Sequence, residues 1–260
     1  MIHHAIISSF ADATLLSILP FIAVGFAAQI VDGALGMAFG VISNTLLITL
    51  GVPPAVATAS VHTVEVFTTG ASGLSHIFHK NVDWRMLWRL VIPGVIGSVL
   101  GAGLIVSINA SAAKPIVMGY LAIMGIYLVW RGLNHKPQER QAKTVAPLGL
   151  VGGFLDAAGG GGWGPVVTGN LLIQGVSPRK VIGTVNTAEF IVTVTAATTF
   201  IAALGLQTFT IATTGILIGG LIAAPMGAVL AKRIDTHRLL VMVGVLMTLT
   251  GSYAVYKAFS

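Results

Sequence analysis

The chain has 260 residues, of which 55% are hydrophobic and only 8% are charged, and its formal net charge is +6. An ordinary soluble domain carries about 25% charged residues, so this composition argues against a soluble globular protein and indicates a membrane protein. The sequence contains no cysteine, which excludes disulfides and thiolate metal sites. Its basic residues gather in short clusters between apolar runs, a distribution typical of topology determinants and not of a nucleic-acid-binding surface.

The first long apolar stretch covers residues 14–50 and is broken in its middle by Asp32-Gly33-Ala34-Leu35-Gly36. It lacks a basic n-region and a small-residue cleavage site, so we expect it to stay in the mature fold and not to act as a signal peptide. Glycine lowers helix stability by about 1 kcal/mol per residue relative to alanine. The sequence therefore predicts two helical arms that are separated by an irregular segment.

Three continuous spans follow, because each segment has the roughly 20 apolar residues that are needed to cross a bilayer. They are predicted over Pro54–Phe78, Met86–Ile108 and Ala112–Trp130. A polar and basic stretch at residues 131–145 comes next, and we expect it to be a cytoplasmic linker. It would divide the chain into a first transmembrane repeat at residues 1–130 and a second at residues 146–260.

The second half begins with another broken apolar stretch, at residues 146–174. Its interruption is the run Asp156-Ala157-Ala158-Gly159-Gly160-Gly161-Gly162, whose consecutive glycines cannot continue a stable helix. Each arm is only about a dozen residues long, which at about 1.5 Å per residue is too short to cross a bilayer. The three spans predicted after it are Pro178–Leu204, Phe209–Ala231 and Leu239–Ala258.

The two halves are copies of each other, because a shift of 124 positions places Asp32 on Asp156 without a gap. The same shift aligns identical residues in the pairs Gly36/Gly160, Gly40/Gly164, Leu47/Leu171, Gly51/Gly175, Val52/Val176, Pro54/Pro178, Val61/Val185, Thr63/Thr187 and Glu65/Glu189. A duplicated half with a broken hydrophobic segment in each copy is typical of membrane transporters that are built from repeats.

Corresponding loops of the two halves carry opposite charge bias. The first half has its basic residues mainly in the loop at 79–89, whereas the second half has them at 179–180 and 232–238. Under the positive-inside rule, this predicts that the two halves are inserted upside down relative to each other. The predicted fold is an all-α membrane protein with two inverted repeats, each a broken re-entrant-like helical hairpin plus three transmembrane helices. The alternative is four full spans per half in parallel repeats.

The two breaks predict the binding site, since irregular backbone at membrane depth is tolerated only where protein or a water-filled cavity covers it. Helices that restart near Met37 and Trp163 would point positive, N–H-rich ends at the midplane, and such ends bind anions. The candidate substrate-binding residues are Asp32, Gly36, Met37, His62, Thr63, Asp156, Gly160, Gly161, Gly162, Trp163, Asn186 and Thr187. The alternatives are close helix packing by the glycines, helix capping by the aspartates, and ordinary packing of His62 and Trp163.

Glu65 and Glu189 lie about 11 residues into their spans, which is close to mid-membrane. An intramembrane carboxylate costs at least about 2.5 kcal/mol by insertion scales, so it marks a functional site by default. We therefore predict that this pair carries a coupled proton, with a structural role as the alternative. The sequence has no motif for a catalytic nucleophile, a metal site or a cofactor, so we predict no catalytic residue, metal or cofactor.

At these residues the chain resembles the sulfite exporter TauE/SafE family, also called the 4-toluene sulfonate uptake permease family. The first copy of the motif is Val31-Asp32-Gly33 with Gly36 and Gly40, followed by Gly51-Val52-Pro53-Pro54. The second and more specific copy is Leu155-Asp156-Ala157-Ala158-Gly159-Gly160-Gly161-Gly162-Trp163-Gly164-Pro165, followed by Gly175-Val176-Ser177-Pro178 and Thr184-x-Asn186-Thr187-x-Glu189. The resemblance covers nearly the whole chain. It implies a multi-pass carrier in the bacterial inner membrane for sulfur-containing anions such as sulfite, sulfonates or sulfoacetate, commonly driven by protons.

The sequence thus predicts a secondary transporter and not an enzyme. Its expected partners are a small anion, protons and the lipid bilayer, without nucleic acid and with homodimerisation left open. One alternative is an intramembrane enzyme that uses Asp32 and Asp156 as an acid/base pair, and another is an anion or proton channel. Saturable uptake with counterflow in proteoliposomes would separate a carrier from both.

Overall fold

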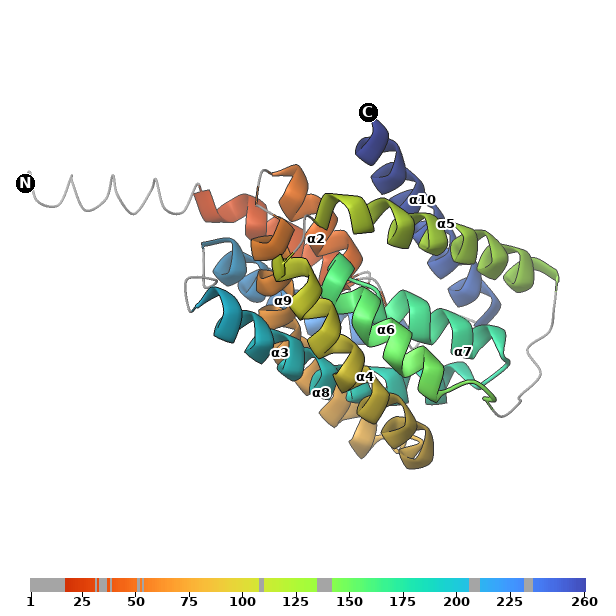
Figure 1. Cartoon of the computed structure of the whole chain (residues 1–260). Helices are drawn as coiled ribbons and strands as arrows, with labels where there is room; N and C mark the ends of the chain where they lie inside the picture. Colours follow the sequence, from red (N-terminus) through yellow and green to blue (C-terminus); the bar gives the residue numbers. More distant parts are fainter. Residues whose placement is uncertain are drawn as a thin grey trace, which may run out of the picture.

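The described part of the chain is all helical, which confirms the predicted all-α class (Figure 1). The computed structural model describes residues 17–30, 32, 37, 39–50, 52, 54–107, 110–134, 142–205, 211–231 and 236–260. The first of its helices is Ser17–Ile30. The others are α2 (Phe39–Thr49), α3 (Pro54–Phe78), α4 (Trp84–Ser107), α5 (Ala110–Asn134), α6 (Ala146–Gly159), the π-helix η1 (Gly164–Thr168), α7 (Gly169–Ile173), α8 (Pro178–Leu204), α9 (Ile211–Ala231) and α10 (Thr236–Phe259).

The predicted continuous spans correspond to the long helices α3, α4, α5, α8, α9 and α10. α3 and α8 have the predicted bounds, and each of them begins at a proline. α5 runs further than predicted, to Asn134, whose side-chain amide donates to the Trp130 carbonyl at 2.8 Å. The first residues of the expected linker therefore continue the helix.

The outward face of α4 is apolar. Trp88, Ile92, Ile96 and Leu100 follow one another at four-residue spacing, and each is more than half exposed. Such spacing places them on one side of the helix, where a water-soluble protein would carry polar residues. In water this stripe would be an unusually large exposed apolar patch, as expected of a face that contacts lipid. α4 and α8 are also long and apolar enough to cross a membrane, which is consistent with the predicted membrane protein.

Each half opens with a pair of short helices. In the second half, α6 has 14 residues and ends at Gly160 and Gly161, whose φ angles are +70° and +136°. The chain then turns back, so that the second arm lies against the first: a side chain at Gly152 of α6 would meet Trp163 and Val167 on the other arm. At about 1.5 Å per residue α6 measures about 21 Å, shorter than the roughly 30 Å hydrocarbon core of a bilayer.

The ends of the two hairpins repeat each other in atomic detail. At the end of α2, the Leu50 N–H donates to Leu46 O at 2.9 Å and the Val52 N–H donates to Leu47 O at 3.0 Å. The equivalent bonds at the end of α7 join Gln174 to Asn170 at 2.9 Å and Val176 to Leu171 at 3.2 Å. The sequence repeat is therefore also a repeat of local structure at these positions.

Equivalent long helices of the two halves pack against each other in antiparallel pairs. Between α3 and α8, Ser72 lies beside Asn186 and Gly70 lies beside Phe190. Between α5 and α10, Gly125 lies against Gly244 and Met118 lies against Gly251. In both pairs the residue numbers rise along one helix and fall along the other. α3 and α5 of the first half therefore run antiparallel to their counterparts α8 and α10 in the second half.

Helices from different halves also pack in parallel pairs, with glycine at the crossings. Along α4 and α6, Leu90 faces Gly149 and Gly94 faces Gly153, and a Cβ on either glycine of α6 would overlap the backbone of α4. α9 packs in the same way on the helix Ser17–Ile30, where a Cβ on Gly219 would overlap the Ile22 carbonyl. Small residues let membrane helices approach this closely. Each hairpin is therefore held by a long helix of the other half.

Candidate functional site

The start of α2, which follows the first break, packs against the second break. Gly40, at the start of α2, lies so close to the second break that a Cβ on it would be 2.9 Å from Gly161 Cα. A Cβ on Gly161 would in turn overlap the main chain of Gly40 and Val41. Two backbones approach this closely only when neither carries a side chain. The contact therefore accounts for glycine at positions 40 and 161.

Asp156 caps the helix that restarts after the second break. Its Oδ1 accepts hydrogen bonds from the main-chain N–H groups of Gly162 at 2.8 Å and Trp163 at 3.0 Å. Asp32 does the same in the first copy, where its Oδ1 accepts from the Phe39 N–H at 3.2 Å. A carboxylate is favourable at the positive end of a helix. The N–H groups that we expected to face an anion thus donate to these aspartates in the structure.

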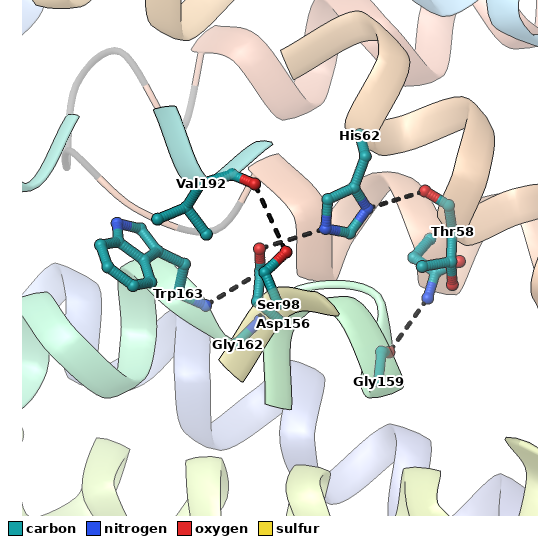
Figure 2. A network of polar contacts seen from close by, with 9 residues as sticks. Thr58, His62, Ser98, Asp156, Gly159, Gly162, Trp163 and Val192 are labelled. Carbon is teal, nitrogen blue, oxygen red and sulfur yellow. Dashed lines mark hydrogen bonds and ion pairs between the residues drawn. The ribbon is translucent and has the colours of Figure 1, made fainter. Parts of the chain in front are cut away.

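His62 bridges the two halves (Figure 2). Its Nε2 lies 3.1 Å from Asp156 Oδ2, and its Nδ1 lies 2.8 Å from the carbonyl oxygen of Thr58. A carbonyl only accepts, so Nδ1 carries a hydrogen and donates it. Nε2 and Oδ2 would repel each other as two lone pairs, so a proton lies between them. Both side chains are buried, and the Phe200 ring from α8 packs on the imidazole with ring centroids 5.7 Å apart.

Glu65 lies one helical turn from His62 and completes a buried cluster. The ligating atoms of His62, Glu65 and Asp156 all lie within 4.8 Å of one another. Glu65 Oε2 is buried and has no hydrogen-bond partner in the described part of the chain. Glu65 also interacts electrostatically with Asp156, Glu189 and Asp32, so acidic side chains of both halves share this region. No Lys or Arg occurs at residues 54–78 or 146–173, which form the helices around the cluster.

The other predicted site residues have their own partners. Thr63 Oγ1 donates to the Ala59 carbonyl at 2.8 Å, and Thr187 Oγ1 donates to the Gly183 carbonyl at 2.7 Å. The Trp163 indole N–H donates to the Val185 carbonyl at 3.3 Å. Met37 is buried, the N–H groups of Gly160 and Gly161 donate to the Asp156 carbonyl, and Gly36 lies outside the described residues.

The site is not symmetric, although it is built from a repeat. Asn186 stands where the first copy has His62, and its side-chain amide donates to Ser72 Oγ at 3.0 Å. Glu189, the counterpart of Glu65, is only partly buried. The buried His–Glu–Asp cluster therefore belongs to one side of the molecule, where α3 of the first half meets the break of the second.

Two further residues at the break were not predicted from the sequence. Asn44 of α2 donates from its side chain to the Gly159 carbonyl at 3.1 Å. Its Oδ1 and the buried Thr58 Oγ1 have no hydrogen-bond partner among the residues that the structure describes, and both side chains lie against Gly160. The one sequence signal for Asn44 is an amide inside an otherwise apolar half-helix.

The family comparison covers both breaks and the helices that surround them. The family described as "Sulfite exporter TauE/SafE" matches residues 21–254. The chain belongs to the sulfite exporter TauE/SafE family. The TauE/SafE match confirms the resemblance that the two glycine motifs indicate, and it spans both halves of the repeat.

Two relatives of this TauE/SafE protein are named as transporters. The chain is 44% identical over 235 residues to "Probable membrane transporter protein YtnM" of Bacillus subtilis (strain 168), covering 86% of this chain and 78% of that protein. It is 26% identical over 149 residues to a "Probable membrane transporter protein" of Haemophilus influenzae, covering 56% of this chain and 58% of that protein. Family and relatives together indicate a membrane transporter rather than an enzyme.

Proposed function

We propose that this TauE/SafE protein is a secondary transporter that moves a small sulfur-containing anion, of the sulfite, sulfonate or sulfoacetate class, across the bacterial inner membrane. The observation that carries the proposal is the contact between the two broken hairpins beside the buried cluster of His62, Glu65 and Asp156. Broken helices that meet at a repeat interface are the usual place for substrate and coupling ions in repeat-built transporters. The chain would be a multi-pass protein of that membrane, and homodimerisation stays open.

We propose that the two halves are inverted in the membrane. The antiparallel pairing of α3 with α8 and of α5 with α10 supports this, because equivalent helices of parallel repeats would run the same way through the bilayer. The short arms of both broken segments support hairpins that enter and leave on one side. The linker at 131–145 would then be cytoplasmic, on the same side as Arg179 and Lys180.

The anion would bind at the restarting helices by competing with the aspartates. Gly162 and Trp163 offer two adjacent N–H groups to Asp156, and an anionic oxygen would use the same pair of donors. Displacement of Asp156 toward His62 would free them while the shared proton keeps the pair together. Asp32 and Phe39 would act in the same way at the first break.

Proton coupling would use Glu65 and Glu189. Each lies in the middle of a long helix, and Glu65 interacts electrostatically with the aspartates of both breaks. Loading or release of a proton at either glutamate changes the net charge that an arriving anion meets. The gradient of protons would in this way be linked to movement of the anion.

The test is uptake of radiolabelled sulfite and of a labelled sulfonate by purified protein in proteoliposomes. A carrier gives saturable uptake and accelerates exchange when unlabelled anion is present on the far side. A channel gives uptake without counterflow, and an enzyme releases a converted product, so either result would overturn the proposal. A thermal-shift screen with sulfite, sulfate, sulfonates and carboxylates identifies the substrate class, because a bound ligand raises the unfolding temperature.

A further inference from the structure

We propose that His62, Glu65 and Asp156 form a binding site for one divalent first-row transition-metal ion. The three side chains come from α3 and from the end of α6, and their ligating atoms lie within 4.8 Å of one another in the described structure. Metal–ligand distances of about 2.0–2.2 Å place neighbouring ligands roughly 3.5 Å apart. Binding would therefore draw the Glu65 carboxylate in by about 1 Å, while Nε2 of His62 and Oδ2 of Asp156, which lie 3.1 Å apart, would separate slightly. The inference does not depend on which anion is transported.

The orientation of His62 is that of a metal ligand. Its Nδ1–H donates to the Thr58 carbonyl, which fixes the ring and directs Nε2 at Asp156. Metal-ligating histidines usually hold their other ring nitrogen in this way. The ion would take the place of the proton between Nε2 and Oδ2, and that proton would leave to solvent.

Glu65 supplies an independent reason to place a cation here. Glu65 is only 3% exposed, its Oε2 has no hydrogen-bond partner among the described residues, and its carboxylate belongs to the same group of ligating atoms. An unpaired buried carboxylate oxygen is costly unless a cation or a donor satisfies it. No Lys or Arg lies in the helices that form the cluster, so a bound ion is the missing counter-charge.

The ligand set selects the class of ion. Two carboxylates balance the charge of a divalent cation, and a neutral imidazole suits zinc, copper, iron and nickel. Three protein ligands leave a further position open on the metal. Zn²⁺ is the natural probe, because it binds such sites tightly and has no redox chemistry.

The binding test uses full-length protein without a histidine tag, purified in detergent and stripped with a chelator. His76 and His79 lie near the surface and could collect zinc, so both are changed to glutamine in the background chain. Equilibrium dialysis against Zn²⁺ with elemental analysis should give one ion per chain. Mn²⁺ should compete weakly, and Na⁺ should not compete at all. X-ray absorption should show one imidazole among oxygen ligands.

Two isosteric variants and one matched control decide the assignment. Glu65→Gln and Asp156→Asn should each weaken zinc binding by about 100-fold or more, while Glu189→Gln, the equivalent change in the other half, should alter it by less than about threefold. Size-exclusion profile and helical circular dichroism establish that each variant is folded. Absence of stoichiometric zinc, or equal losses in all three variants, would overturn the site. Both measurements are made without substrate, so they fail or succeed separately from the transport assay.

Discussion

Asp156 and Asp32 occupy equivalent positions, but a histidine stands only beside Asp156, because Asn186 replaces His62 in the other half. Asp156 accepts two main-chain N–H bonds and pairs with His62, whereas Asp32 accepts the Phe39 N–H. Asp156→Ala leaves a buried histidine and two donors without partners, so we expect a loss of about 3–5 kcal/mol. Asp32→Ala removes a helix cap, worth about 1 kcal/mol. Thermal unfolding in detergent should show the larger drop in Tm for Asp156→Ala, and equal drops would contradict the asymmetry.

At the same scale, Glu65 and Glu189 should differ in their effect on coupling. Glutamine mimics a protonated carboxyl that cannot release its charge, so uptake driven by a pH gradient should collapse in either variant. Exchange of substrate for substrate needs no change in protonation and should survive. Because His62 lies three residues from Glu65 and Asn186 three residues from Glu189, Glu65→Gln should change the pH dependence of transport more. Wild-type pH profiles in both variants would return the glutamates to a structural role.

The structural role of an individual residue could be predicted from the sequence where a local rule applies to it. A carboxylate before a run of glycines predicts a helix break, and the second break lies where its motif predicts it. The pairing of His62 with Asp156 was not foreseeable, because 94 positions separate them and no local pattern links one half to the other. The capping of the Gly162 and Trp163 N–H groups by Asp156 could not be predicted for a similar reason. A sequence shows that a helix restarts, but not whether its own aspartate or a ligand caps it.

At the scale of helices and breaks, the second break requires glycine at position 161. Gly161 has φ +136°, and a Cβ on it would lie 2.6 Å from the Gly40 carbonyl carbon, so Gly161→Ala combines backbone strain with overlap. We expect a loss of more than about 2 kcal/mol. Gly103 of α4 has open space where a Cβ would lie, so Gly103→Ala should be neutral or stabilising by about 0.5–1 kcal/mol. Unfolding midpoints measure both, and a tolerated alanine at 161 would contradict the close contact.

Helix extents followed from hydrophobicity, but their ends and irregularities did not. α3 and α8 begin at prolines, a start signal that a sequence displays openly. The π-helix at Gly164–Thr168 has no such signal. It contains Pro165, which lacks an N–H, and the Asn170 side chain donates to the Val166 carbonyl at 2.7 Å. Such a bulge depends on how several local hydrogen bonds compete, which apolar periodicity does not reveal.

For the whole molecule, the internal repeat is the strongest guide in the sequence, because it links two segments that lie far apart along the chain. It predicts that the breaks meet, and Gly40 and Gly161 do touch. It does not predict which helices of different halves pack together. The pairing of α4 with α6 depends on glycines whose partners lie in the other half. Which helices pack together, and whether they run parallel or antiparallel, is therefore visible only in the structure. The orientation of the two halves relative to the membrane stays a prediction.

The predicted membrane orientation can be tested at the two ends of α8. Lys180 Nζ donates to the Lys80 carbonyl at 2.9 Å, and the Asp83 N–H donates to Thr184 Oγ1 at 2.9 Å, so the loop after α3 lies beside the start of α8. Gly205 lies at the far end of α8, about 40 Å away at 1.5 Å per residue. Reporter enzymes fused in loop 79–89 and in loop 204–209 should therefore report opposite sides, with the basic loop 79–89 in the cytoplasm. A fusion in the linker at 135–141 is the control and should agree with loop 79–89. Cytoplasmic signals from both test loops would mean that the repeats are parallel in the membrane.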